Sequence, residues 1–477
     1  EAIRALRKAA PMPYLQQVSS FQPVIELAKS KLIQKELGDL EEAPRLEDKK
    51  VIEVQLMEWG AAIEDLAEAS AYPIDKVISL DGSSQTTQFE RGVAGATLNY
   101  ITYAAIVTDI KKYKELAKQR IIDPVAFRAM EDRSSRATVL PGENILVRGC
   151  RTTRDSFRKK VYELFENPEM SFLEKKPLAE VLDRVVAHTE KSRREGAEGP
   201  AGKIRCPHDT GHLYEYSRQP RPCPVCKETV YPTDWLRLHE NIMPSGAGTG
   251  EAIGGLGQVM EHLTAVGILQ WMEEENILGA TKHYAIIIDG PLAIFGTAAE
   301  LHRGIQAELK RINRLCVGRF GHEIAMVGIS KTGAFVGEFE RIDTFRNGAP
   351  NRIKGGRAIL LGTRYINTRV VPSRDSTKEH GEGTYYSEKI LYKTKSNMRL
   401  ALTIPRLSDA PREPGEPPEA KDIPRLQDIL RLMEDTATHR YENAIGPVIS
   451  AHNEASIPLN LGRKILEEMA RKHIASR

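Results

Sequence analysis

Apolar residues recur along the chain at two spacings, one typical of strands and the other typical of helices. Short apolar runs over 77–80 and 284–288 predict buried strands, and a run over 94–107, with Tyr and β-branched residues, predicts another strand. Helical spacing over 298–315 is followed by an apolar run over 323–329 that predicts a further strand. Because strands and helices alternate here, the sequence favours an α/β fold.

The segments around this core predict the domain organisation. We expect a helical N-terminal region over 1–70, a central domain over 71–460 that contains a helical and Cys-rich insertion over 110–230, and an amphipathic C-terminal helix over 461–477. The insertion is rich in Lys, Arg and Glu, which is typical of solvated helix faces. The pattern further predicts helical structure over 235–275, paired strands over 385–396 and 398–406, and a Pro- and Glu-rich loop over 408–424.

Length and composition limit the class of protein. The 477 residues suffice for two or three packed layers or domains, and the hydrophobic share of 41% excludes wholesale disorder. The chain has no run of 18 apolar residues, so we expect no transmembrane helix, and its first residues lack the apolar stretch of a secretory signal. The formal net charge of +3 does not by itself identify a nucleic-acid binder. It is compatible with a basic patch on one part of the surface.

Three of the five cysteines, Cys206, Cys223 and Cys226, lie close together in the sequence. An odd number of cysteines without an export signal argues against a disulfide framework and favours a reducing cytoplasm. The Cys223-Pro-Val-Cys226 turn points two thiolates at one ion, which is typical of a structural zinc site. Cys206 would be the third ligand, and His212, or alternatively His208, the fourth, with Asp209 as a more remote candidate. A redox-active Cys-x-x-Cys pair is the competing interpretation.

Two predicted strands end in Asp-Gly, one at Asp81 and the other at Asp289. A single Asp-Gly is most simply a turn. Two carboxylates at the ends of neighbouring strands would instead be held rigidly, and their oxygens suit a hard divalent cation. The pair therefore makes a metal site a serious alternative to two turns.

Three further residues are candidates for the same chemistry. Lys331 follows an apolar strand, where it would either extend to solvent or orient a water and neutralise a phosphate. Glu261 lies near the buried face of a predicted helix and needs a partner there. His452 follows an apolar run at a predicted helix start, where a lone histidine is more often a capping or core residue. Nucleotide-binding glycine loops and a Gly-x-Ser-x-Gly elbow are absent from the sequence, so we do not expect ATP hydrolysis by this chain alone.

Eight segments occur in an order that resembles the NurA family of DNA-end-processing nucleases, in its longer bacterial form. They span about residues 75–460 and are LDGSSQ at Asp81, YPTDWLRLHE from Tyr231, VMEHL at Glu261, IIIDGPLAIFG around Asp289, VGISKTGAF at Lys331, RYINTRV from Arg364, ILYKTKS from Ile390 and ISAHNEASIP at His452. The resemblance implies an RNase H-like mixed sheet flanked by helices. It also implies a Mn²⁺- or Mg²⁺-dependent nuclease that acts on DNA, as a 5′–3′ exonuclease and as an endonuclease.

The resemblance further implies partners and roles for individual residues. It implies a homodimer that works with a hexameric HerA-type ATPase, in double-strand break repair or antiphage defence. Asp81, Glu261 and Asp289 match the acidic metal ligands, Lys331 matches a lysine of the following strand, and His452 matches a histidine near the C-terminus. In metal-assisted hydrolysis the carboxylates would hold the ions, and Lys331 and His452 would act on the nucleophile or the scissile phosphate.

One departure from the family pattern favours an alternative function. The acidic residue expected just before Tyr365 is missing, because Gly362, Thr363 and Arg364 stand there. Asp343 is a candidate to replace it in space, which the sequence alone does not test. The alternative is a catalytically weakened DNA-binding subunit that regulates an ATPase ring.

Basic residues near two of these segments are candidates for contact with DNA phosphates. Lys393, Lys395 and Arg357 are the candidate contacts, together with Arg352 and Lys354. Because phosphate contacts release counterions, binding through these residues should weaken with salt.

Overall fold

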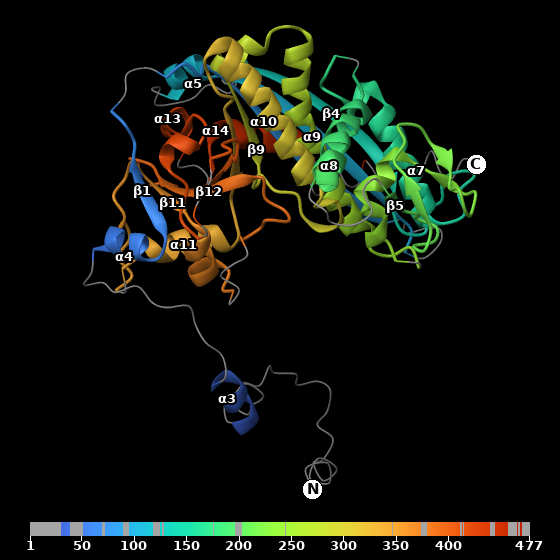
Figure 1. Ribbon diagram of the computed structural model, residues 1–477, viewed down its shortest axis with the longest axis horizontal. Helices are drawn as coiled ribbons and strands as arrows, with labels where there is room; N and C mark the ends of the chain where they lie inside the picture. Colours follow the sequence, from blue (N-terminus) through green and yellow to red (C-terminus); the bar gives the residue numbers. More distant parts are fainter. Residues whose placement is uncertain are drawn as a thin grey trace. The chain divides into compact units, whose positions relative to one another are not determined.

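The structure is a computed structural model of the chain (Figure 1). It describes residues 30–38, 51–68, 72–88, 95–117, 125, 128–174, 176–195, 203–243, 245–345, 347–373, 379–410, 413, 415–438, 444–456, 465 and 468–469. The chain divides into two compact units, Glu1–Arg45 and Leu46–Arg477. In the first unit the described part is α3 (Lys31–Gly38).

The second unit is built on a mixed sheet of nine strands within the described residues, in the order β1-β11-β12-β13-β10-β9-β2-β3-β4. β2 runs parallel to β9 and β9 parallel to β10, whereas the other neighbours are antiparallel. The stretch from β4 to β10 has the strand order and directions of an RNase H-like sheet, as expected. The strands are β1 (Ala61–Asp65), β2 (Lys76–Gln88), β3 (Thr97–Asp109), β4 (Glu131–Pro141), β9 (Tyr284–Asp289), β10 (Met326–Ser330), β11 (Arg357–Leu361), β12 (Ser387–Lys393) and β13 (Arg399–Pro405).

Helices cover both faces of this sheet, as Figure 1 shows. Side chains alternate along β9: Ile286 and Ile288 pack in one core with α7 to α10, and Ala285 and Ile287 pack in another with α13 and α14. A third core lies between α4, α11 and the β11 end of the sheet. The helices are α4 (Ile52–Glu58), α5 (Ile110–Ala117), α7 (Thr153–Glu166), α8 (Leu178–Glu195), α9 (Thr249–Glu274), α10 (Leu301–Phe320), α11 (Ala334–Ile342), α12 (Thr363–Tyr365), α13 (Leu426–Thr436) and α14 (Gly446–Ala455).

Smaller elements complete the unit. Two short hairpins form the Cys-rich insertion, β5 (Lys203–Arg205) with β6 (Leu213–Glu215) and β7 (Arg221–Pro222) with β8 (Thr229–Val230). Single helical turns are η1 (Pro168–Met170), η2 (Pro232–Leu236), η3 (Leu238–Asn241), η4 (Leu278–His283), η5 (Gly296–Ala298), the π-helical η6 (Ile366–Val370) and η7 (Ala420–Asp422).

The structure differs from the sequence prediction in three places. The helical pattern over 51–70 forms α4 and then β1, because Gly60, with φ +90°, ends the helix, so this part of the predicted region 1–70 lies in the second unit. The charge-rich segment after 110 contains β4 in addition to helices. The strand over 77–80 does not turn at Asp81-Gly82 but continues to Gln88. The predicted helix over 461–477 falls almost entirely outside the described residues.

Helix α9 is the most apolar long helix among the described residues. By length and composition it would be able to cross a membrane, but 72% of its most apolar window is buried inside the protein. That burial is typical of a core helix, and α9 packs in the core shared with α8 and α10.

Candidate metal centre

Two adjacent parallel strands bring Asp81 and Asp289 together. In the β2–β9 register Leu80 lies opposite Ile288, so the next residue of each strand is an aspartate. Because Val77 of β2 and Ile287 of β9 pack in the core on the α14 side, alternation directs both aspartates toward α14. Side-chain exposure is 7% for Asp81 and 13% for Asp289. The two carboxylates therefore meet at the end of the buried part of the sheet.

Two basic side chains contact these carboxylates. His452 Nδ1 lies 2.8 Å from Asp81 Oδ2 and 3.9 Å from Asp289 Oδ2. Lys331 directly follows β10, where Ile329 pairs with Asp289, and its ammonium donates to Asp289 Oδ2. His452 lies in the last turn of α14 rather than at a helix start. Ligand atoms of Asp81, Asp289 and His452 all lie within 4.8 Å of one another, which is compatible with one shared ion.

The electrostatics of Asp81 show why a cation suits this place. Burial, and after it the charge of Asp289, raises the pKa of Asp81 to about 6, while the hydrogen bond from His452 and the charge of Lys331 lower it. Two ionised carboxylates this close repel each other. A divalent cation with oxygen ligands would relieve that repulsion, so the donor set fits Mn²⁺ or Mg²⁺.

Glu261 approaches the same place from the opposite face of the sheet. It lies on α9, and it accepts a hydrogen bond from the Gly82 backbone N–H. A Cβ atom at Gly82 would lie 2.9 Å from Glu261 Oε1, so the glycine permits this approach. Burial, and then the charges of Asp81 and Asp289, raise the pKa of Glu261 well above its ordinary value. Glu261 is thus next to the three-residue group but not part of it, and its role as a ligand stays a prediction.

Two cavities meet at Asp289. A cavity of about 680 Å³ is lined by Asp81, Asp289, Lys331 and His452, and a smaller one of about 250 Å³ lies between α9 and β2 and contains Glu261. Gly82, Gly290 and Pro291 line both. The carboxylates are therefore open to a ligand from the larger cavity.

The same cavity contains residues that the sequence did not single out. The lining of this larger cavity also includes the aromatic side chains of Phe295, Phe335, His380 and Tyr385. These residues lie in loops and in the first turn of α11, where no periodicity marks them.

A second candidate metal site lies in the Cys-rich insertion. Ligand atoms of Cys206, His212, Cys223 and Cys226 all lie within 4.8 Å of one another, with Cys206 Sγ 3.7 Å from Cys226 Sγ. Although burial raises the pKa of the Cys223 thiol, the backbone N–H groups of Cys226 and Val225 lower it to about 7. The arrangement fits a tetrahedral zinc ion.

The structure distinguishes the two histidines that the sequence left open. His208 Nε2 lies 2.9 Å from an Arg158 nitrogen and 3.2 Å from the Thr229 carbonyl oxygen, so it packs against α7. His212 Nδ1 is buried without a hydrogen-bond partner, and its Nε2 lies 3.4 Å from Asp209 Oδ2. A carboxylate on the far nitrogen of a ligating histidine is typical of zinc sites, so His212 fits as the fourth ligand.

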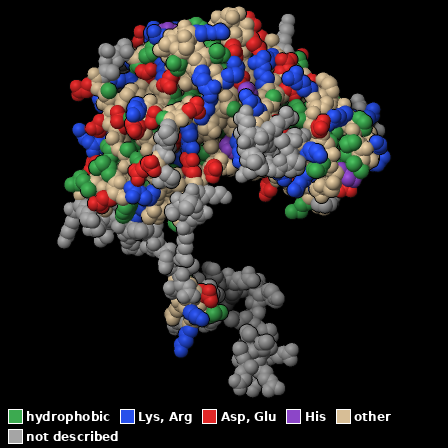
Figure 2. All heavy atoms as spheres, in the orientation of Figure 1, with side chains coloured by type: hydrophobic (Ala, Val, Ile, Leu, Met, Phe, Trp, Pro, Cys, Tyr) green, Lys and Arg blue, Asp and Glu red, His purple; other side chains and the backbone are tan. Residues whose placement is uncertain are grey.

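The residues predicted to contact phosphate differ in how accessible the structure leaves them. Lys393 is fully buried, and its ammonium lies 2.7 and 2.8 Å from the two oxygens of Asp343, so neither residue is available at the candidate site. Arg357 pairs with Asp65 at 2.8 Å and with Glu53, and its side chain is only 17% exposed. Lys395 is exposed. In Figure 2 Lys and Arg side chains intermix with Asp and Glu on the visible face, in agreement with the small net charge.

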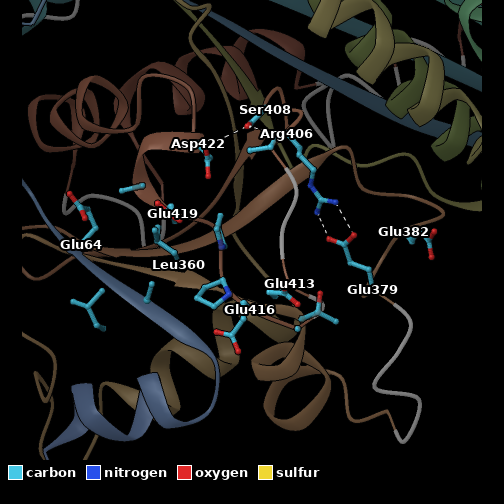
Figure 3. Close-up of a pocket in the computed structure, with 18 residues that line it drawn as sticks. Glu64, Leu360, Glu379, Glu382, Arg406, Ser408, Glu413, Glu416, Glu419 and Asp422 are labelled. Carbon is cyan, nitrogen blue, oxygen red and sulfur yellow. Dashed lines mark hydrogen bonds and ion pairs between the residues drawn. The ribbon is translucent and has the colours of Figure 1, made fainter.

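Another cavity, of about 880 Å³, lies elsewhere in the unit (Figure 3). Arg406 is the one cationic residue in the described lining, and it pairs with Glu379. Thr363 is one of the residues at the position where the family pattern has an acidic residue. It lines this cavity and not the metal centre. The acidic lining residues are Glu64, Glu379, Glu382, Glu413, Glu416, Glu419 and Asp422. So many carboxylates would repel a phosphate backbone, so this cavity is unsuited to DNA.

Comparison with known proteins gives matches to structures only. No family model and no curated protein matches the chain. The chain is similar to the crystal structure of the NurA nuclease from Sulfolobus solfataricus, with 10% identity, 97% and 99% of the two chains covered, and a TM-score of 0.33. It is also similar to NurA bound to dAMP and manganese, with 12% identity, 95% and 97% covered and a TM-score of 0.27. A further NurA structure aligns with 13% identity, 95% and 97% covered and a TM-score of 0.26. TM-scores this low transfer no residue positions or roles to this chain.

Proposed function

We propose that the chain is a divalent-metal-dependent nuclease that hydrolyses phosphodiester bonds in DNA. The observation that supports this most is the meeting of Asp81 and Asp289 with His452 within 4.8 Å, beside Lys331 and an open cavity. Paired carboxylates on two neighbouring strands are the ligands that Mn²⁺ and Mg²⁺ need, and a lysine beside them suits a phosphate.

Each side chain has a part in this proposal. Asp81 and Asp289 would hold a divalent cation, which when bound supplies Lewis-acid stabilisation and an activated water. The hydrogen bond with His452 fixes the orientation of Asp81. Lys331 places a positive charge at Asp289, where it would bind a non-bridging phosphate oxygen. Glu261, at Gly82, would act as a further ligand or as the acceptor of a proton from water.

The test is cleavage of end-labelled linear duplex and single-stranded DNA with Mn²⁺, by the wild type and by Asp81→Asn and Asp289→Asn. We expect cleavage by the wild type and at least about 1000-fold less by either variant, because ligands of one ion act as a unit. Asp65→Asn is the matched control, because Asp65 ends strand β1 of the same sheet but lies outside the candidate site. Equal cleavage by wild type and Asp81→Asn would contradict the proposal.

The alternative is a DNA-binding subunit with weakened catalysis. Asp343, the candidate substitute for the missing acidic residue, pairs with the buried Lys393, which favours this alternative. It predicts DNA binding without cleavage by the wild type.

The Cys-rich insertion is proposed to hold a structural zinc ion. Four protein ligands, Cys206, His212, Cys223 and Cys226, leave no open position for a substrate, so a catalytic zinc is not expected. Arg158 of α7 binds Asp234 and the Thr229 carbonyl, which would connect the zinc-bound hairpins to the core. Zinc would thus stabilise the two Cys-rich hairpins against α7.

Partners are proposed from the sequence resemblance alone. They are a second copy of the chain and a hexameric HerA-type ATPase, in break repair or antiphage defence in the cytoplasm. Light scattering of the purified chain and co-elution with such an ATPase test them separately. A monomer at micromolar concentration would contradict the proposed homodimer. Failure to co-elute with the ATPase would contradict the proposed complex.

A further inference from the structure

The cavity of the candidate metal centre has two chemically different walls. Asp81, Asp289, Lys331 and His452 form the polar wall. The other wall, which we call the aromatic wall, consists of Phe295, Phe335, His380 and Tyr385. A metal site and a phosphate explain the polar wall only, so the aromatic wall requires a different ligand group.

The four rings contact one another in series. The Phe295 and Tyr385 ring centroids lie 5.6 Å apart at 82°, and those of Tyr385 and His380 lie 5.9 Å apart at 47°. Phe335 meets His380 at 5.9 Å and 68°. Three separate segments supply these rings, the loop after β9, the start of α11 and the loop before β12. Their convergence in one cavity is therefore a product of the tertiary structure.

The backbone holds this wall rigidly beside the metal centre. The loop after Asp289 pairs with the loop before β12 through the Ala293–Tyr385 bridge and through the Ile294 N–H, which donates to the Thr384 carbonyl at 2.9 Å. Gln258 of α9 accepts from the Phe295 N–H at 2.9 Å. Despite this anchoring, Phe295 is 42% exposed. A fixed, half-exposed phenyl ring at a cavity has a surface available for stacking.

The rings are uncharged at neutral pH. Burial, and then the charge of Lys389, lowers the pKa of His380 to about 4, and burial raises the pKa of Tyr385. The Lys389 ammonium lies 4.1 Å from the Tyr385 ring centroid and donates to the His380 carbonyl at 3.1 Å. Neutral aromatic faces next to positive charge suit a nucleobase with its phosphate close by.

We propose that the aromatic wall, with Phe295 and Tyr385 at its centre, is a stacking subsite for an unpaired nucleobase whose phosphate lies at Asp81 and Asp289. The subsite rests on the proposed function for the position of the phosphate. Stacking on a side chain requires a free base face, which the interior of a duplex does not offer. The substrate segment in the cavity is therefore single-stranded DNA, either free or at an opened end.

The experiment measures binding rather than cleavage. The full chain with Asp81→Asn is titrated with a fluorescent single-stranded DNA 12-mer, and with the same oligonucleotide carrying one abasic residue at each position in turn. We expect an abasic residue at one position to weaken binding by about 5- to 150-fold. In the same background, Phe295→Leu and Tyr385→Leu should weaken binding of the intact oligonucleotide to a similar extent. Each should also remove the difference in affinity between the intact and the abasic oligonucleotide.

Two controls address folding. Phe320→Leu replaces a phenylalanine of similar exposure, 45%, at the end of α10 outside this cavity, and should leave binding unchanged. Phe295→Tyr keeps a stacking ring and should retain discrimination between intact and abasic DNA. A near-ultraviolet circular dichroism spectrum equal to that of the parent shows that each variant is folded.

The outcomes separate the subsite from the nuclease proposal. If folded Phe295→Leu and Tyr385→Leu bind intact and abasic DNA as the parent does, the subsite is wrong, whether or not the wild type cleaves DNA. If discrimination depends on these rings but the wild type with Mn²⁺ cleaves nothing, the subsite stands and the nuclease proposal fails.

Discussion

His452 Nδ1 lies 2.8 Å from Asp81 Oδ2, although the two residues are 371 positions apart in the sequence. Two contacts just after His452 hold the end of α14 over the sheet: Glu454 pairs with Arg133 of β4 at 3.2 Å, and the Thr102 hydroxyl of β3 donates to the Ala455 carbonyl. The candidate centre is thus complete only when α14 is docked on β3 and β4.

Asp81→Asn should stabilise the metal-free protein at pH 7, because it removes a buried charge next to Asp289. With the pKa of Asp81 raised to about 6, we expect a gain in the free energy of unfolding of about 1–3 kcal/mol. Between about pH 4 and pH 6, Asp81 is protonated in the folded wild type but ionised in the unfolded chain. The free energy of unfolding of the wild type therefore rises as the pH falls through that window. The gain of the variant should therefore shrink toward pH 4.

Denaturant unfolding with EDTA at pH 4.5, 5.5 and 7 measures this difference, with Asp65→Asn as the control. If the stability gained by Asp81→Asn increased as the pH falls, the raised pKa of Asp81 would be wrong. Added Mn²⁺ should reverse the order at pH 7, because it binds only the folded wild type.

Lys331→Met should separate metal binding from catalysis. The lysine ammonium occupies Asp289 Oδ2, so its removal should strengthen Mn²⁺ binding by on the order of tenfold. Cleavage at saturating metal should nevertheless fall by about 100-fold or more, because a positive charge for the phosphate is lost. Titration calorimetry and single-turnover cleavage measure the two effects. Weaker Mn²⁺ binding in the variant would show that Lys331 orients the carboxylate rather than competes for it.

His212→Ala should lose zinc, whereas His208→Ala should retain it. The reason is that His208 binds Arg158 and Thr229, while His212 Nδ1 lies buried without a hydrogen-bond partner. Elemental analysis of protein purified without chelator should find about one zinc per chain in the wild type. Cys150→Ser is the matched cysteine control, because Cys150 lies outside the cluster. Loss of zinc in His208→Ala alone would overturn the assignment.

Lys393→Met should destabilise the protein by about 3–5 kcal/mol, because it leaves the Asp343 carboxylate buried without its charge partner. Lys395→Ala, two residues away and exposed, should change stability by less than about 0.5 kcal/mol. Thermal or denaturant unfolding compares the two variants. If Lys393→Met is as stable as the wild type, Lys393 does not have the structural role described here.

The sequence predicted the central strands because buried parallel strands read as continuous apolar runs. β9 coincides with the run over 284–288, and β10 overlaps the later part of the run over 323–329. It failed at β4, where exposed and half-buried residues alternate in a charge-rich segment that reads as a helix surface. Asp81-Gly82 read as a turn, but pairing with β3 continues the strand beyond it. Edge and half-exposed strands lack the apolar signal on which such predictions depend.

Residue chemistry and local spacing were sufficient to identify Asp81, Asp289 and the Cys223–Cys226 turn as candidates, since each signal lies within a few residues. Only the tertiary structure decided which partners meet. It put Asp81 and Asp289 on the α14 face with His452, and it put Glu261 on the opposite face at Gly82. It also buried Lys393 and assembled the aromatic wall. The physical reason is that strand register and helix docking set distances between residues hundreds of positions apart, and local patterns contain no information on those distances.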